Sequence, residues 1–200
     1  MLVTHGAILT RGVWRLPPHG LWFDAKIFAL GGRPAATRAP SAPIGNTKER
    51  TNAMSVRETA QQAFKNHLEY LSSGRIEEWV DLFTDDGVLE FPYGPADFPK
   101  KVEGKQALFD YMRNFPEHFK VEFVDLRFHE TIDPTLVIAE FTSVGQALST
   151  GKPYNQTYIS VVETAEGKIS RYVDFWNPLV AAEALNATGD SSLYAAFDAS

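Results

Sequence analysis

The sequence contains no cysteine, which excludes disulfide bonds, thiolate nucleophiles and cysteine-based zinc sites. Histidine occurs at five positions, but never in the His-x3-His or His-Glu-x-x-His spacing that is typical of zinc-binding helices. We therefore expect neither a metal nor another cofactor.

Basic residues are few and scattered. The chain has 19 Lys and Arg residues against 25 Asp and Glu residues, which gives a net charge of −6. The absence of a basic run argues against nucleic acid or an anionic membrane surface as a partner. The apolar runs are also far shorter than the roughly 18 residues that a membrane-spanning helix needs. We expect a soluble protein of the cytoplasm, a reducing compartment.

Residues 1–53 differ in composition from the rest of the chain. Proline and arginine recur in this segment, whereas Asp24 and Glu49 are its only acids, and no hydrophobic period of 2 or 3.6 persists. It could be a mitochondrial presequence, although Pro17 and Pro18 would break the helix that a presequence needs. Alternatively, it is a disordered extension, or upstream sequence translated from a wrong start codon, with Met54 as the true initiator. The last explanation is favoured.

Residues 54–187 carry a regular pattern. Ser55 and Glu58 have the spacing of a capping box, and apolar residues then recur at helical intervals until Gly74. Asn177 and the proline after it are typical of the start of a final helix. The further elements predicted in between are short helices over 75–83 and 104–115, a strand over 87–91 and β segments over 119–132, 135–148, 154–164 and 168–176.

Helices followed by long antiparallel strands indicate the α+β class. We expect the helices to cross one face of a strongly curved antiparallel sheet and to enclose a cone-shaped pocket. Residues 188–200 offer little to bury and are predicted to be a flexible tail.

The order of several short motifs resembles a known superfamily. These motifs are "LFTDDGVLEFPYG", "NFPEHFKVEF", "YNQTYISVV" and "DFWNPL". Over residues 55–187 they resemble the NTF2-like (cystatin-like) superfamily, and within it the SnoaL-like polyketide cyclases and most of all the phenazine-biosynthesis A/B proteins. This resemblance implies a pocket for a small molecule, used in secondary metabolism such as antibiotic biosynthesis.

The resemblance also suggests roles for individual residues. Asp174 corresponds to the Glu of the phenazine family that is proposed as a general acid/base. His67 lies at the first-helix position where ketosteroid isomerase has its oxyanion-holding tyrosine. Phe91, however, stands where that isomerase has its catalytic Asp, and Trp79 where the phenazine proteins have a basic residue. The resemblance therefore implies catalysis by Asp174 and His67, but not the ketosteroid isomerase mechanism.

The alternation of the last predicted strand divides its residues between two faces. Tyr172, Asp174 and Trp176 share one face, which we predict to line the pocket, and Val173 and Phe175 share the other, which we predict to form a homodimer. A carboxylate among aromatic residues is costly to bury without a partner. The alternative is that Asp174 is a surface acid.

A second acid and a few polar or aromatic residues are further candidates. Glu140 interrupts an apolar strand, where an outward position paired across the sheet is the more usual explanation. For binding an aromatic or apolar ligand we single out Tyr158 and Asn155, and we expect Phe91 and Tyr93 to border the pocket mouth.

These observations favour a cofactor-free enzyme. It would assist the cyclisation, condensation or isomerisation of an aromatic or polyketide-like intermediate by proton transfer. The alternative is a non-catalytic ligand-binding or dimerisation module with the same fold.

Overall fold

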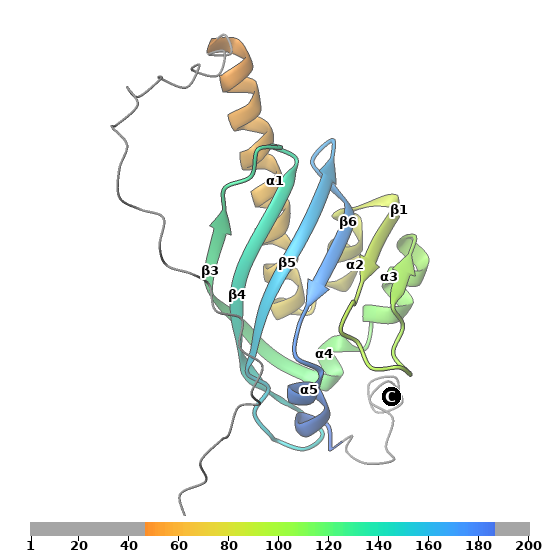
Figure 1. The fold of residues 1–200 in the computed structure, drawn as a ribbon. Helices are drawn as coiled ribbons and strands as arrows, with labels where there is room; N and C mark the ends of the chain where they lie inside the picture. The colour runs from red at the N-terminus through yellow and green to blue at the C-terminus, as the bar shows by residue number, and fades with distance from the viewer. Residues whose placement is uncertain (1–46, 187–200) are drawn as a thin grey trace, which may run out of the picture. The chain divides into compact units, whose positions relative to one another are not determined.

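The computed structural model describes residues 47–186, which form five helices and a six-stranded sheet (Figure 1). Along the chain the elements are α1 (Thr47–Ser73), α2 (Ile76–Asp81), β1 (Phe83–Glu90), β2 (Lys101–Glu103), α3 (Lys105–Met112), α4 (Phe115–His118), β3 (Phe119–His129), β4 (Leu136–Ala147), β5 (Gln156–Ala165), β6 (Lys168–Phe175) and α5 (Pro178–Ala184). The predicted tail, 188–200, lies outside the described residues, as do residues 1–46 of the predicted extension.

Helix α1 begins earlier than the capping box predicts. It starts at Thr47, and Ser55 lies within it, where the Ser55 carbonyl accepts a hydrogen bond from Thr59 Oγ1 at 2.9 Å. Neither glycine nor proline interrupts this stretch, so nothing in the local sequence stops the helix from extending backwards. Its end is as predicted, because Gly74 adopts a φ of 70° just after the last helical residue.

The sheet has the strand order β2-β1-β6-β5-β4-β3. Strands β3 to β6 form the predicted antiparallel meander, and β1 pairs with β6 in parallel. Strand β2, which the sequence analysis missed, adds three residues at the edge beside β1. The sheet is therefore mixed and curled rather than purely antiparallel, and β6 lies near its middle.

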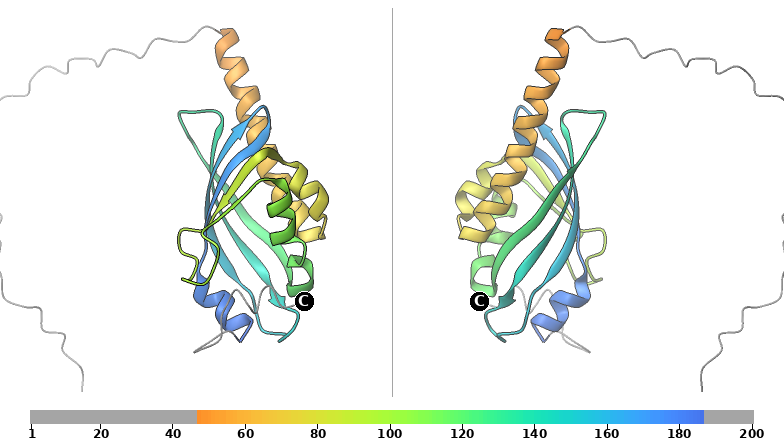
Figure 2. Two further views of the ribbon diagram at one scale, coloured as in Figure 1. Left: turned by 90° about the vertical axis from the view of Figure 1, so that its right-hand side faces the viewer. Right: turned by 90° about the vertical axis from the view of Figure 1, so that its left-hand side faces the viewer.

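Helices α1 to α4 cover the concave face of the sheet, as the two side views show (Figure 2). Apolar residues of α1, among them Phe64 and Leu68, are buried against the strands. The predicted helix over 104–115 corresponds to α3, which ends at Met112, and a further short helix, α4, begins at Phe115 with Pro116 in its first turn. Proline is well tolerated there, since the first turn needs no backbone donor.

Helix α5 follows β6 directly and begins as predicted. The side chain of Asn177 accepts a hydrogen bond from the backbone N–H of Leu179, which caps the helix. At the other end, Thr150 Oγ1 and Lys152 Nζ, both from the β4–β5 loop, donate to the carbonyls of Ala184 and Glu183. The first end of this short helix is thus capped by its own Asn177, and the other end is held by the β4–β5 loop.

Candidate functional site

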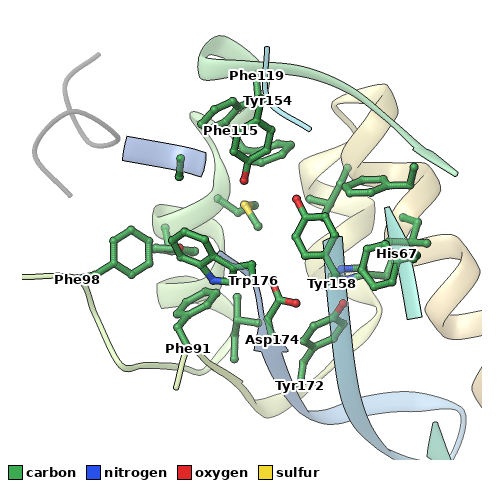
Figure 3. Close-up of a pocket in the computed structure, with 18 of the residues that line it drawn as sticks. His67, Phe91, Phe98, Phe115, Phe119, Tyr154, Tyr158, Tyr172, Asp174 and Trp176 are labelled. Atoms are coloured by element: carbon green, nitrogen blue, oxygen red, sulfur yellow. The ribbon is translucent and has the colours of Figure 1, made fainter. Parts of the chain in front are cut away.

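A cavity lies between the helices and the concave face of the sheet (Figure 3), and the empty space in it and at its open mouth amounts to about 750 Å³. Aromatic rings make up most of its wall: Phe91, Phe98, Tyr111, Phe115, Phe119, Phe123, Phe141, Tyr154, Tyr158, Tyr172 and Trp176. Such a wall favours an aromatic or apolar small molecule as the ligand.

Among residues 47–186, Asp174 is the only carboxylate in the cavity wall. It lies on β6 opposite Ser160 of β5, and Ser160 Oγ donates a hydrogen bond to Asp174 Oδ1 at 3.1 Å. Burial raises the pKa of Asp174 to about 7, although the hydrogen bond from Ser160 acts to lower it. A carboxyl group with this pKa can both release and accept a proton near neutral pH.

Ser160 also connects Asp174 to Tyr172. The hydroxyl oxygens of Ser160 and Tyr172 lie 2.8 Å apart, and both residues are buried. Ser160 has a single proton, so when it donates to the ionised Asp174 it must accept from Tyr172. The result is a directed chain from Tyr172 through Ser160 to the carboxylate. Because this chain comes from neighbouring strands of the sheet, it holds the carboxylate in place.

His67 reaches the cavity from α1 and is held from behind by α2. The indole N–H of Trp79 donates to His67 Nδ1 at 2.8 Å, and the imidazole stacks on Tyr172 with 4.5 Å between ring centroids. Burial lowers the pKa of His67 to about 3, so the ring is neutral at ordinary pH. Since Nδ1 is the acceptor, the ring proton resides on Nε2, which makes His67 a hydrogen-bond donor and not a base.

Two tyrosines from the start of β5 and the loop before it contribute hydroxyl groups. The hydroxyls of Tyr154 and Tyr158 point into the cavity in Figure 3, and the two side chains interact with each other. Burial raises the pKa of Tyr154 to about 12 and that of Tyr158 well above its usual value. Both hydroxyls therefore remain protonated and can act as donors.

The structure brings most of the candidate residues to the cavity. Those that line it are Asp174, His67, Tyr158, Tyr172, Trp176 and Phe91. Sequence reasoning missed Tyr154, although it has the same parity as Tyr158 along the extended chain, and it missed Ser160, which the parity of β5 places on the inner face together with them.

Three other candidates do not reach the cavity. Tyr93 lies on the opposite face of the sheet, where it is 65% exposed and packs against Phe175. Asn155 is exposed and accepts a hydrogen bond from the backbone N–H of Gly145, because odd-numbered residues of this segment face outward. Trp79 is fully buried behind His67, so it can act on a ligand only through that histidine.

Glu140, the competing acid, lies on the outer face of the sheet. Its carboxylate forms an ion pair with Arg127 at 3.3 Å and a hydrogen bond with His129 at 3.0 Å, both on the neighbouring strand β3. This is the cross-strand pairing that the sequence analysis considered more usual. Of the two acids, only Asp174 belongs to the cavity.

Within residues 47–186 no three His, Asp or Glu side chains are grouped so that they could hold a metal ion. No helix in this range is both long and apolar enough to cross a membrane.

Comparison with known proteins identifies the family. The model of the SnoaL-like domain matches residues 64–172, more than half of the chain. The chain belongs to the SnoaL-like family. An uncharacterized PhzA/B-like protein of Pseudomonas aeruginosa is 45% identical over 63% of this chain and 89% of its own length. The resemblance predicted from the sequence is thus confirmed.

Solved structures confirm the NTF2-like fold. A Bacillus subtilis protein with a provisional assignment as an isomerase is 39% identical, with a TM-score of 0.63 over 64% of this chain and 94% of its own. A phenazine biosynthesis-related protein of Pseudomonas aeruginosa is 21% identical, with a TM-score of 0.58 over 68% of this chain and 91% of its own. At that identity the second likeness concerns the fold alone.

Proposed function

We propose that this protein is a cofactor-independent enzyme that rearranges, cyclises or condenses an aromatic or polyketide-like intermediate by moving a proton. The observation that carries this proposal is the carboxyl group of Asp174, which lies in an aromatic cavity where burial raises its pKa to about 7. A carboxylate with ordinary solvation would be a much weaker base. The likeness to a PhzA/B-like protein agrees with a role in secondary metabolism.

Asp174 acts as the base in the first step and as the acid in the second. Its carboxylate takes a proton from a carbon next to a substrate carbonyl, and the C–H electron pair moves into the carbonyl to give an enolate. The protonated Asp174 then returns the proton to another carbon or to oxygen, so the enzyme ends unchanged. Ser160, which donates to Oδ1, keeps the carboxylate oriented during both transfers.

His67 contributes a fixed donor rather than a second base. Its Nδ1 is occupied by Trp79, and its pKa near 3 keeps the imidazole neutral. The Nε2–H group can therefore donate to a polar atom of the substrate without competing with Asp174 for the proton. In this proposal Asp174 on β6 transfers the proton, and His67 on α1 orients the substrate.

Proton exchange tests the proposal directly. Aromatic ketones with acidic C–H groups are incubated with the protein in deuterium oxide, and the loss of each C–H signal is followed by NMR. We expect Asp174→Asn to slow the exchange by ~10²–10⁴. The matched control is Glu140→Gln, which makes the same change to an acid on the outer face and should leave the rate unaltered.

If the protein is instead a non-catalytic binding module, it should not accelerate proton exchange. If wild-type protein binds these ketones but exchanges their protons no faster than Asp174→Asn does, the enzyme proposal fails. The pH profile adds a second criterion. The exchange rate should rise with pH and level off above about 7, since the base form of Asp174 accumulates over that range.

A further inference from the structure

The wall of the cavity offers no cation to a ligand. None of its lining residues is a lysine or an arginine, within the part of the chain that the structure describes. His67 is neutral, so the only charge that the wall can carry is the negative charge of Asp174. An anionic ligand would lose its hydration here without gaining a counter-charge. The cavity therefore selects against carboxylates and phosphates.

The polar groups of the cavity form two separate sites. On one side Asp174 is supported by Ser160. On the other side the hydroxyls of Tyr154 and Tyr158 point toward each other and into the open space (Figure 3). Both tyrosines are only 7% exposed, and their hydroxyls interact with each other, while Ser143 lies beside that of Tyr158.

The tyrosine pair is held rigidly. The Tyr158 ring stacks on Phe141 with 4.7 Å between centroids and 7° between planes, and the Tyr154 ring packs on Phe119 at 4.1 Å. Ser143 Oγ lies 3.5 Å from the Tyr158 hydroxyl and accepts a hydrogen bond from the backbone N–H of Gln156. Rings fixed in this way keep their hydroxyls in one place, so a ligand loses little by ordering them.

Most of the remaining wall consists of aromatic rings, with aliphatic side chains between them. Phe91 and Phe98 meet Trp176 edge to face at 6.4 Å and 5.5 Å, and of the described residues that line the cavity only Asp174 carries a charge. Such a wall favours a planar, aromatic ligand body.

We infer that the substrate is an uncharged aromatic ketone, an inference that rests on the proposed function. The carbonyl oxygen of this ketone accepts hydrogen bonds from the Tyr154 and Tyr158 hydroxyls, and its acidic C–H group faces Asp174. The two donors stabilise the negative charge that develops on this oxygen when Asp174 removes the proton. Tyr154 and Tyr158 are thereby specificity-determining residues as well as catalytic ones.

Three probes of similar shape test this inference by binding, which does not require turnover. Acetonaphthone carries a carbonyl, ethylnaphthalene has none, and naphthoate carries an anionic carboxylate. Affinities for the full chain are measured by calorimetry. We expect acetonaphthone to bind roughly tenfold more tightly than ethylnaphthalene, as one or two hydrogen bonds would give. Naphthoate should bind more weakly than acetonaphthone.

The variants Tyr154→Phe and Tyr158→Phe should remove the preference for the ketone and leave the affinity for ethylnaphthalene unchanged. Unchanged hydrocarbon binding shows that the cavity is still folded. The matched control is Tyr70→Phe, the same change on α1 at a ring that packs against the Arg75 guanidinium outside the cavity. It should retain the roughly tenfold preference for the ketone.

The inference is overturned if the two Phe variants still prefer the ketone, or if naphthoate binds as tightly as acetonaphthone. Failure of the proposed function is a separate result. Asp174→Asn should lose proton exchange yet keep the preference for the ketone, because the tyrosine pair is untouched. Ketone selectivity without proton exchange in the wild type would support the inference on the ligand and reject the enzyme.

Discussion

Trp79 fixes the tautomer of His67 by donating its indole N–H to Nδ1 at 2.8 Å. Both rings are buried, and they lie on different helices, α1 and α2. The hydrogen bond thus fixes the packing of the two helices and also the chemical character of the imidazole that reaches the cavity. Trp79 does not line the cavity, yet it leaves Nε2 as the atom of His67 that carries the ring proton.

The variant Trp79→Phe should remove the preference of His67 for a single tautomer. It removes the donor to Nδ1, so the ring proton should distribute between both nitrogens, which 15N NMR of the imidazole detects. The loss of the hydrogen bond and of buried volume should also lower the free energy of unfolding by about 1–3 kcal/mol. Trp176→Phe makes the same change at the cavity wall and should leave the His67 tautomer as it is. A wild-type spectrum with the proton on Nδ1 would contradict this assignment.

Asp174 should reduce the stability of the protein as the pH rises. The pKa of this carboxyl is about 7 in the folded protein and 3.8 in the unfolded chain, so the folded state binds more protons between these values. Stability attributable to Asp174 is complete below pH 4 and is lost as the pH rises through 7. Relative to wild type, Asp174→Asn should therefore become more stable over this interval, by at most about 4 kcal/mol.

Urea unfolding of wild type and Asp174→Asn at several pH values measures this difference. In both proteins the contribution of His67 to the free energy of unfolding depends on pH in the opposite direction. Its pKa is lowered to about 3 in the folded protein, whereas the unfolded chain takes up a proton below 6.5. That contribution cancels when the two proteins are compared. A difference in unfolding free energy that does not change between pH 4 and 8 would mean that the carboxyl is not buried as described.

We predict a homodimer through the outer face of the sheet. Val144 and Ile159 are 56% and 47% exposed on this face, and Ile159 pairs with Phe175, whose ring packs against Tyr93. Apolar side chains grouped on a sheet face are usually covered. Sedimentation of the wild type should give twice the mass of the chain, and Ile159→Lys should give the mass of one chain.

The control for this experiment is Gln62→Lys, which adds the same charge at an exposed position of α1. It should sediment like the wild type. A single-chain mass for the wild type at micromolar concentration would refute the prediction of a dimer.

The first residues of α1 should contribute little to stability. Residues 47–52 are exposed along the helix, so a chain that begins at Met54 loses few contacts. In such a chain Ser55 would lie at the start of the helix, where with Glu58 it can form the capping box that the longer helix does not use. We expect the free energy of unfolding of residues 54–200 to agree with that of the full chain within ~0.5 kcal/mol. A larger loss would show that the preceding residues pack on the domain.

The fold and the central acid of the site could be predicted because they depend on patterns along single elements. Strand alternation places Tyr172 and Asp174 on one face whatever surrounds the strand, and the helix signals at Gly74 and Asn177 act locally. The start of α1 was predicted at the wrong residue. A capping box stabilises a helix only at its N-terminus, and Ser55 lies inside α1.

Other parts of the site depend on how elements pack together. Whether Trp79 faces the ligand or supports His67 depends on the rotation of α2 against α1, which one short helix does not specify. The role of Ser160 depends on the register between β5 and β6. Tyr93 lies in a loop whose path no periodic pattern determines. For Asn155 the sequence alone was sufficient. Its odd number places it on the opposite face of the extended chain from Tyr158, which would have excluded it from the cavity.

The parallel pairing of β1 with β6 has a consequence for biosynthesis. Arg171 binds Glu90 across this pairing although the two are 81 residues apart in the sequence. The ribosome must therefore deliver nearly the whole domain before β6 can insert between β1 and β5, and contacts of such long range form slowly. Until then the aromatic wall is exposed to water and to other nascent chains. Asp174 belongs to that last strand, so an unfinished chain can aggregate through its aromatic residues while it still lacks the carboxyl group of the cavity.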